Sequence, residues 1–303
     1  MSSLQERLGF AATDRLLIVH ADDIGMCEAT VSAWRELHGQ SAMTSASAMA
    51  TCPWFPAAVK AVQEAGESAD MGLHLVLNCE WRAGYRWGPI TGTDTPAKLC
   101  AEDGYFYPLA ADTYANADLA HSQIELAAQL KRARTLGLPL THIDCHMMTA
   151  LHPDVVGHML QLGHSANLPI LVPRYSDASL LAKESTMPLD WCERTSAQLK
   201  TAAEAGQLNP IDAWAVLPFG QYLGADERLH WASMVLQHYF TAPGVYALIG
   251  HPANDGTELR AIAPDWPTRV ADRDLFANPD FRAVIEREGF KLIGMKALAQ
   301  LHN

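Results

Sequence analysis

Seven residues whose side chains could do acid–base or metal chemistry stand at the ends of apolar, strand-like runs. Carboxylates, imidazoles and a guanidinium in one pocket suit hydrolysis, because together they can bind a cation, accept a proton and donate one. Each of these runs is short and is followed by helix-like sequence. The seven residues are Asp22, Asp23, His74, Asp144, His146, Arg174 and His251.

Five of the strand-like runs position these residues. The runs span residues 16–23, 71–78, 141–146, 169–174 and 245–252. If the strands are parallel in one sheet or barrel, their carboxyl ends share a face and the polar side chains converge there. Polar residues that serve only the core would be distributed along the strands rather than concentrated at their ends. The layout therefore predicts an active site.

The whole chain alternates strand and helix, which is typical of parallel α/β folds. The apolar runs predict eight strands, with helical periodicity between most of them. No glycine-rich phosphate loop follows the first strand, which disfavours a flat doubly wound sheet. We therefore predict an α/β fold of one domain over residues 1–303, a deformed, TIM-like (β/α) barrel. The predicted strands begin near Leu16, Thr44, Met71, Pro139, Pro169, Ile211, Val245 and Lys291.

Composition excludes several classes of partner. The chain has 303 residues, 49% of them hydrophobic, which is enough for one large core. Its formal charge of −12 argues against nucleic acid or an anionic membrane as partner. The sequence contains no apolar stretch of signal-peptide or transmembrane type, so we expect a cytoplasmic protein. The six cysteines form no CxxC pair, which favours reduced thiols over a structural zinc site.

One connection, residues 79–118, is too long for a simple strand-to-helix loop and is rich in aromatic residues, including Trp81. Long loops in compact domains are usually functional or disordered, and this composition disfavours disorder. We expect the insertion to lie near the active-site face. Its aromatic rings suit the faces of sugars, with Trp81 as a substrate contact, but they suit a small core within the loop equally well.

Asp23, His74 and His146 offer a mixed nitrogen and oxygen ligand set that suits one divalent ion, magnesium or zinc, with positions left for water and substrate. Such an ion lowers the pKa of bound water from about 15.7 toward about 7. Asp22, next to a ligand, could accept the water's proton, and His251 could give a proton to the departing group. This set is complete for hydrolysis of an amide or ester.

Each residue also has a purely structural interpretation. A doubled aspartate after a strand can be a turn in which Asp23 caps the next helix. His74 lies on the strand face opposite three leucines, and burial of its imidazole implies a polar partner. His142, Asp144 and His146 alternate onto one strand face, where a hydrogen-bonded trio competes with a ligand and its supporting carboxylate.

We expect two further residues, Asp144 and Arg174, at the periphery of the site. Asp144 could orient a ligand imidazole, as carboxylates behind metal-bound histidines do. Arg174 could orient Asp22 or bind a substrate oxygen, although a plain surface salt bridge explains it nearly as well. Cys145 lies between two candidate residues, but strand alternation turns its thiol to the opposite face.

Several motifs in their order along the chain resemble the YdjC-like carbohydrate deacetylase family. They are HADDIG, TSASAMA, GLHLVLN, THIDCH, VPR and GHP, followed by a tail that begins at Arg269. The resemblance spans nearly the whole chain and implies metal-dependent hydrolases on a deformed (β/α) barrel that remove acetyl groups from N-acetylated sugars. It implies that Asp22 is the catalytic base, that Asp23, His74 and His146 are metal ligands, and that His251 is a late catalytic or substrate-contacting histidine.

The chain departs from the family pattern after the fourth strand. Members typically continue as Asp-x-His-x-His-x-His, whereas this chain keeps His146 and has Met148 and Ala150 at the next two histidine positions, with Met147 between. Methionines would make this wall softer and less polar. The departure predicts a different preferred substrate or a lower rate than in the typical members.

The sequence therefore predicts a metal-dependent hydrolase that releases acetate and a free amino sugar from an N-acetylated mono- or oligosaccharide. Two alternatives stay open: hydrolysis of a non-sugar acyl amide or ester, and a catalytically silent sugar-binding barrel. The sequence leaves the sugar, the metal and the choice between a monomer and a homodimer open.

Overall fold

Parallel strands form the centre of the molecule in the computed structural model, which describes residues 2–81, 84–94, 98–185 and 187–302. The strands are β1 (Arg15–Ile24), β2 (Ser45–Ala48), β3 (Met71–Leu75), β4 (Leu140–Cys145), β5 (Ala213–Val216), β6 (Gly244–Gly250) and β7 (Phe290–Leu292). Six of them pair in the order β4-β3-β2-β1-β6-β5, and β7 pairs with the first residues of β1. All of these pairings are parallel, which confirms the predicted α/β class.

A short extended segment joins the two edges of this sheet. Ile170 bridges Ile143 on β4, and Pro173 bridges Ile211 just before β5. The ring of strands is thereby closed into a deformed barrel. The predicted strand near Pro169 is wrong as a regular strand: among the described residues it makes only these isolated bridges. Pro169 and Pro173 lack backbone N–H groups, so the segment cannot form a continuous ladder.

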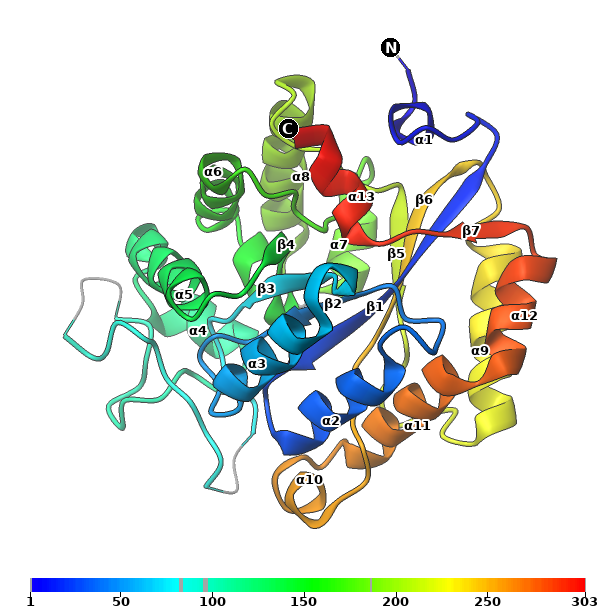
Figure 1. Ribbon diagram of the computed structural model, residues 1–303. Coiled ribbons are helices and arrows are strands. Elements are labelled where there is room, and N and C mark those ends of the chain that lie inside the picture. The colour runs from blue at the N-terminus through cyan, green and yellow to red at the C-terminus, as the bar shows by residue number, and fades with distance from the viewer. Residues whose placement is uncertain (1, 82–83, 95–97, 186, 303) are drawn as a thin grey trace.

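Helices surround the barrel (Figure 1). Those expected from periodicity are α2 (Glu28–Leu37), α3 (Phe55–Ala65), α5 (Gln123–Thr135), α6 (Val156–Ala166), α8 (Leu189–Glu204), α9 (Ala225–His238) and α12 (Pro279–Arg287). The sequence reading missed α1 (Leu4–Arg7), α4 (Ala110–Asn116), α7 (Ala178–Glu184), α10 (Thr257–Ile262), α11 (Trp266–Ala277) and α13 (Met295–Ala299). Short 3-10 turns occur at η1 (Gly66–Ser68), η2 (Leu119–His121), η3 (His146–Leu151) and η4 (Gln300–His302).

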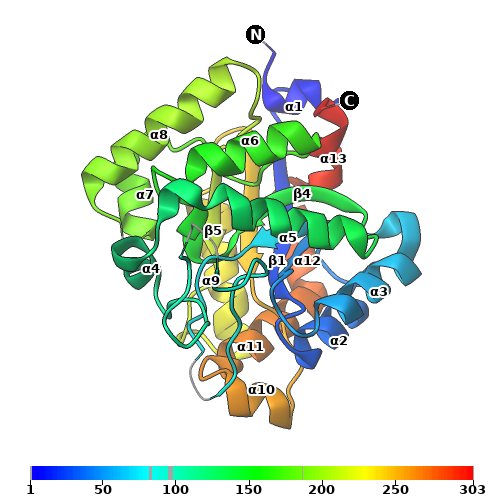
Figure 2. The same ribbon diagram turned by 90° about the vertical axis from the view of Figure 1, so that its left-hand side faces the viewer.

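The two ends of the barrel differ in what covers them. The α1 and α13 helices lie at the end where β1 begins, whereas α10 and the 79–118 insertion lie at the other end (Figures 1 and 2). Residues 82–83 and 95–97 of the insertion are outside the described residues. None of the helices in the described ranges has the length and apolarity needed to cross a bilayer.

Strand alternation divides the interior of the barrel into two layers. On β1, Leu16 and Ile18 join an apolar cluster with alternate residues of β6 and with α1 and α13. His20 and Asp22 continue the same face of β1 toward its carboxyl end, because successive side chains of a strand alternate between faces. Leu17 and Val19 point the other way, into the core beneath the helices. The barrel is thus apolar where its strands begin and polar where they end.

Candidate metal-binding and catalytic site

The predicted chemical residues meet at the carboxyl ends of four strands. Asp22 and Asp23 lie in the last residues of β1, and His74 lies at the end of β3. His146 follows β4 directly, and His251 follows β6. Parallel pairing brings these strand ends to one face, as the sequence reading expected.

Asp23, His74 and His146 form the centre of the site. All three are buried, and each offers a ligand atom within 4.8 Å of the others. Asp23 Oδ1 lies 3.1 Å from His146 Nδ1 and 3.5 Å from His74 Nε2, yet it has no partner with hydrogen-bond geometry. A buried carboxylate oxygen left in this state costs free energy. Its position facing two imidazole nitrogens fits the ligand set of one divalent ion.

Two carboxylates fix the outward nitrogens of the histidine pair. His74 Nδ1 donates to Asp144 Oδ1 at 2.9 Å, and His146 Nε2 donates to Glu80 Oε2 at 2.8 Å. The other nitrogen of each ring therefore faces Asp23, where it would offer its lone pair to a bound ion once its proton is displaced, and carboxylates orient metal-binding histidines in this way. Burial lowers the pKa of His146, but the charges of Glu80 and Asp23 outweigh it and raise this pKa to about 10.

A buried arginine supports Asp23 from behind. Arg269 Nη1 donates to Asp23 Oδ2 at 2.9 Å, and its Nε donates to Asp265 Oδ2 at 2.9 Å. Burial raises the pKa of Asp23, but the charges of His146 and Arg269 outweigh this effect and hold the pKa well below its usual value. The backbone of Asp23 has φ 63°, in the left-handed region. Such a conformation is costly for a non-glycine residue and is enriched at functional sites.

Asp22 stands beside this centre, between two imidazoles. Its Oδ1 lies 3.0 Å from His20 Nε2, and its Oδ2 lies 3.9 Å from His251 Nε2. His20 is fully buried, and its Nε2 also lies 2.9 Å from Asp144 Oδ2. Burial lowers the pKa of His20, but its hydrogen bond to Asp144 and the adjacent carboxylate of Asp22 outweigh burial and raise the pKa to about 10.

His251 is held by a separate buried ion pair. Its backbone N–H donates to Asp272 Oδ2 at 2.8 Å, and its Nδ1 lies 3.8 Å from the same oxygen. Asp272 in turn pairs with Arg228, and both side chains are fully buried. Arg228 also donates to the carbonyl of Pro218 at 2.7 Å, which ties this pair to the loop after β5.

Trp81 covers His146. Its ring stacks on His146 with centroids 5.8 Å apart, and the guanidinium carbon of Arg269 lies 5.2 Å from the ring centroid. Trp81 is buried, and it also packs on Trp87 at 4.8 Å. The insertion thus touches the site through Glu80 and Trp81, while these contacts also form a small aromatic core. The contact of Trp81 with a sugar stays a prediction.

Arg174 is not part of this cluster. Its side chain is 50% exposed and pairs with Asp212 at 3.3 Å. Asp212 precedes β5 and accepts from the backbone of Val245, at the opening of β6, so the pair lies toward the amino ends of the strands. The expectation that Arg174 orients Asp22 or binds substrate is thus corrected, because the 169–174 segment runs as a bridge rather than as a strand that ends at the site.

The wall that departs from the family pattern has an unusual backbone. Met147 and Met148 both have positive φ, 48° and 55°. The Met147 side chain is 44% exposed and Asn78 Nδ2 lies 2.9 Å from its sulfur. Ala150 is fully buried, so an imidazole there would displace its neighbours. Of Met147 and Ala150, only Met147 is therefore exposed next to His146.

Sequence reasoning missed four residues that support the site: His20, Glu80, Arg269 and Asp272. The signal for His20 was available, because residues two apart on a strand share a face and Asp22 was already a candidate. The tail that contains Arg269 and Asp272 is part of the family resemblance, but the sequence assigned neither residue a function. Glu80 lies in the irregular insertion, where no periodic pattern predicts the position of a side chain.

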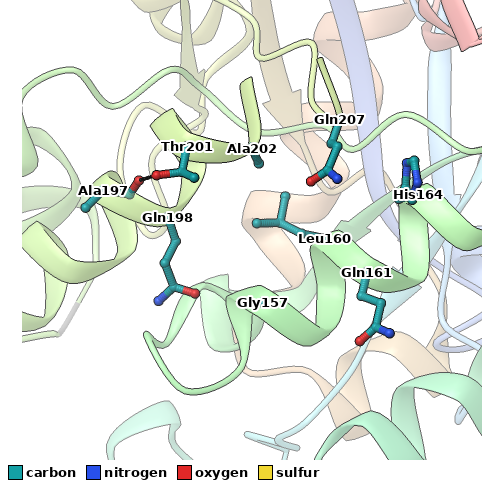
Figure 3. Close-up of a pocket in the computed structure, with 9 residues that line it drawn as sticks. All are labelled: Gly157, Leu160, Gln161, His164, Ala197, Gln198, Thr201, Ala202 and Gln207. Carbon is teal, nitrogen blue, oxygen red and sulfur yellow. Dashed lines mark hydrogen bonds between the residues drawn. The ribbon is translucent and has the colours of Figure 1, made fainter. Parts of the chain in front are cut away.

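Two other features are separate from this centre. His20, His142 and Asp144 also offer ligand atoms near one another, but both oxygens of Asp144 already accept hydrogen bonds from imidazole nitrogens. A pocket of about 460 Å³ lies on the outer surface between α6 and α8 (Figure 3). Gly157, Gln161 and Gln198 line it, and it contains none of the residues of the metal-binding set.

The chain is similar in sequence to proteins named carbohydrate deacetylase. The chain is 32% identical over 282 residues to a protein of Thermus thermophilus named carbohydrate deacetylase, covering 93% of each chain. It is 23% identical over 289 residues to a carbohydrate deacetylase of Enterococcus faecalis, covering 95% of this chain and 99% of the relative.

A solved structure shares the fold. It is an Enterococcus faecalis protein provisionally described as a cellobiose-phosphate cleavage protein, with a TM-score of 0.74, 21% identity and coverage of 94% of this chain and 99% of that one. A family model described as YdjC-like protein matches residues 16–287, from the start of β1 to the end of α12. On this match over most of its length, the chain belongs to the YdjC-like protein family.

Proposed function

We propose that this protein removes the acetyl group from an N-acetylated mono- or oligosaccharide by metal-dependent hydrolysis. One observation carries the proposal: a buried three-residue ligand set converges at the strand ends with Asp22 and His251 beside it. The name carbohydrate deacetylase, borne by relatives that match nearly the whole chain, supports a sugar as the substrate.

Asp23, His74 and His146 would hold one divalent ion. When bound, such an ion polarises a carbonyl group and makes water more acidic. The orphaned Oδ1 of Asp23 and the two oriented imidazoles fit that ion. Mixed nitrogen and oxygen ligands permit either magnesium or zinc, although imidazoles favour zinc.

Asp22 and His251 account for the protons of the reaction. Asp22 takes a proton from the attacking water as the new carbon–oxygen bond forms. The carbon–nitrogen bond then breaks, and His251 gives a proton to the departing amine. Acetate and an amino sugar result. The distance of 3.9 Å between Asp22 Oδ2 and His251 Nε2 supports this assignment of an acceptor and a donor beside one reacting centre.

An exposed aromatic ring beside His251 offers a surface for the sugar. Phe219 follows β5, is 47% exposed, and its ring centroid lies 4.7 Å from that of His251. A sugar packs its C–H groups against such a ring while its hydroxyls bond elsewhere. We therefore place Phe219, which the sequence reading did not single out, on the substrate side of His251.

The exposed Met147 favours a second candidate, hydrolysis of a non-sugar acyl amide or ester. The family resemblance expects imidazoles at positions 148 and 150, where this chain has Met148 and the buried Ala150. The exposed Met147 lies between His146 and these positions and adds a second thioether to the wall. A less polar wall suits a less polar substrate. In either case the ligand set and the acid–base pair do the same chemistry.

Acetate release separates these functions. Purified protein, analysed for bound metals, is assayed with a panel of N-acetylated mono- and oligosaccharides and a matched panel of small acyl amides and esters. Acetate from a sugar, lost after chelation and regained on metal addition, is the expected result. Activity on the small amides or esters alone would contradict the sugar assignment. Sugar binding that survives chelation, with no product from either panel, would favour a silent barrel.

A further inference from the structure

His20 lies at the junction of two parts of the site. Its Nε2 lies 2.9 Å from Asp144 Oδ2 and 3.0 Å from Asp22 Oδ1. The hydrogen bond to Asp144 has good geometry, whereas Asp22 Oδ1 meets the same nitrogen off its axis and has no other partner. Both neighbours are carboxylates, which accept only, so Nε2 carries the hydrogen.

The same contacts continue to a metal ligand. Asp144 uses its second oxygen to accept from His74 Nδ1 at 2.9 Å. Ser47 Oγ lies between the two imidazoles, 3.3 Å from His20 Nε2 and 3.0 Å from His74 Nδ1. A chain of close polar contacts thus runs from Asp22 through His20 and Asp144 to His74, with hydrogen bonds at its last two links.

We propose that His20 is a positioning residue that fixes Asp22 for catalysis and couples it to the ligand His74 through Asp144. This inference rests on the proposed function, in which Asp22 accepts the proton of water. Without the imidazole N–H, the carboxylates of Asp22 and Asp144 would face each other with no donor between them. Asp22 would then turn away, toward solvent, and lose its alignment with the reacting water.

A purely structural role for His20 would have a different signature. Packing alone would be served by any ring of similar size, and the barrel interior offers a matched comparison in His142. This residue is also fully buried, and its ring centroid lies 5.2 Å from that of His20. Its Nδ1 bonds to Thr141 and it has no contact with Asp22 among the described residues.

The test compares His20→Phe, His20→Gln and the control His142→Phe, all loaded with saturating metal. Phenylalanine keeps the ring and removes the N–H, whereas glutamine keeps an N–H donor at a similar reach. We expect His20→Phe to lower kcat by about 10- to 100-fold, the usual effect of a residue behind the first ligands, with KM and metal content nearly unchanged. His20→Gln should recover much of kcat, and His142→Phe should keep it.

A second readout does not depend on turnover. In metal-loaded protein labelled with ¹⁵N-histidine, Asp22→Asn should shift the His20 Nε2 proton resonance, while the exposed-site change Asp118→Asn should not. If the unaltered protein does not release acetate from any sugar, the proposed function fails. The His20 resonance then still tests the contact between His20 and Asp22, because it does not depend on turnover. An unshifted resonance, unchanged kcat in His20→Phe, or a loss of kcat that glutamine does not restore would overturn the proposal.

Discussion

Arg269 Nη1 lies 2.9 Å from Asp23 Oδ2, deep in the protein, so the guanidinium neutralises one oxygen of a carboxylate whose other oxygen faces two histidines. The arginine comes from α11, far along the chain from β1. It leaves Oδ1 as the only oxygen of Asp23 directed at the ligand set. This division of one carboxylate between a buried arginine and a candidate metal site has measurable consequences.

Replacing Arg269 should destabilise the fold in a metal-dependent way. Arg269→Met leaves Asp23 and Asp265 without their buried partner, and breaking such a pair costs about 3 kcal/mol or more. Added metal should restore part of the loss, since the ion would supply positive charge to Asp23. Denaturant unfolding with and without metal measures this. Arg273→Met on the same helix, where the side chain pairs with Glu36 near the surface, should cost less than about 1 kcal/mol. An equal loss of unfolding free energy in Arg269→Met and Arg273→Met would contradict the role of Arg269 as the buried partner of Asp23.

Removing the base should leave the metal in place. Asp22→Asn keeps the size of the side chain and removes its ability to accept a proton. We expect metal content near that of the unaltered protein and a fall in turnover of about a hundredfold or more, the usual size of a general-base effect. Elemental analysis and acetate release measure the two quantities. Retained turnover would remove Asp22 from its proposed role.

Removing a ligand should have the opposite signature. His74→Ala or His146→Ala should empty the site, because each takes away one of three ligands. Metal per protein chain is the measurement, and His121→Ala, at an exposed histidine paired with Asp118, is the control. A fully loaded His74→Ala or His146→Ala variant would refute the ligand assignment.

His142 should make the folded state sensitive to acid. Burial, with a smaller effect from His20, lowers the pKa of His142 to about 3. An unfolded histidine has a pKa of about 6.5, so between these values the unfolded chain binds more protons and stability rises with pH. The contribution is complete above about pH 6.5 and is lost as pH falls.

Comparison with the variant His142→Phe isolates the contribution of this histidine to the free energy of unfolding. The free energy of unfolding of the unaltered protein should fall relative to the variant by about 2 kcal/mol from pH 7 to pH 5. Denaturant unfolding of both proteins across this range gives the difference. Parallel pH profiles would show that His142 keeps an ordinary pKa.

Truncating Phe219 should weaken sugar binding more than chemistry. Phe219→Ala removes the exposed ring beside His251, and we expect KM to rise about 5- to 10-fold with a smaller change in kcat, as loss of an aromatic contact would give. Tyr239→Ala, at a tyrosine 78% exposed on the end of α9, is the control. A KM equal to that of the control would place the sugar elsewhere.

Much of the fold could be predicted from local pattern. The alternation of apolar runs and helical periods specified a parallel α/β fold, since these two periods are properties of the chain itself. The α11 helix was missed because its face toward the barrel carries buried polar residues, Arg269 and Asp272 among them, which hide an apolar period. The strand near Pro169 was wrong because prolines prevent a regular ladder there.

The sequence by itself determined the candidates for the site: Asp22, Asp23, His74, His146 and His251 stand where strands end, and parallel strands share that end. Only the tertiary structure decided their partners. Glu80, Arg269 and His20 contact the candidate ligands and the candidate base from segments distant in sequence, and Arg174 lies outside the site. The physical reason is that side-chain periodicity reports the face on which a residue lies, whereas a hydrogen bond depends on which other segment the folded chain brings opposite that face.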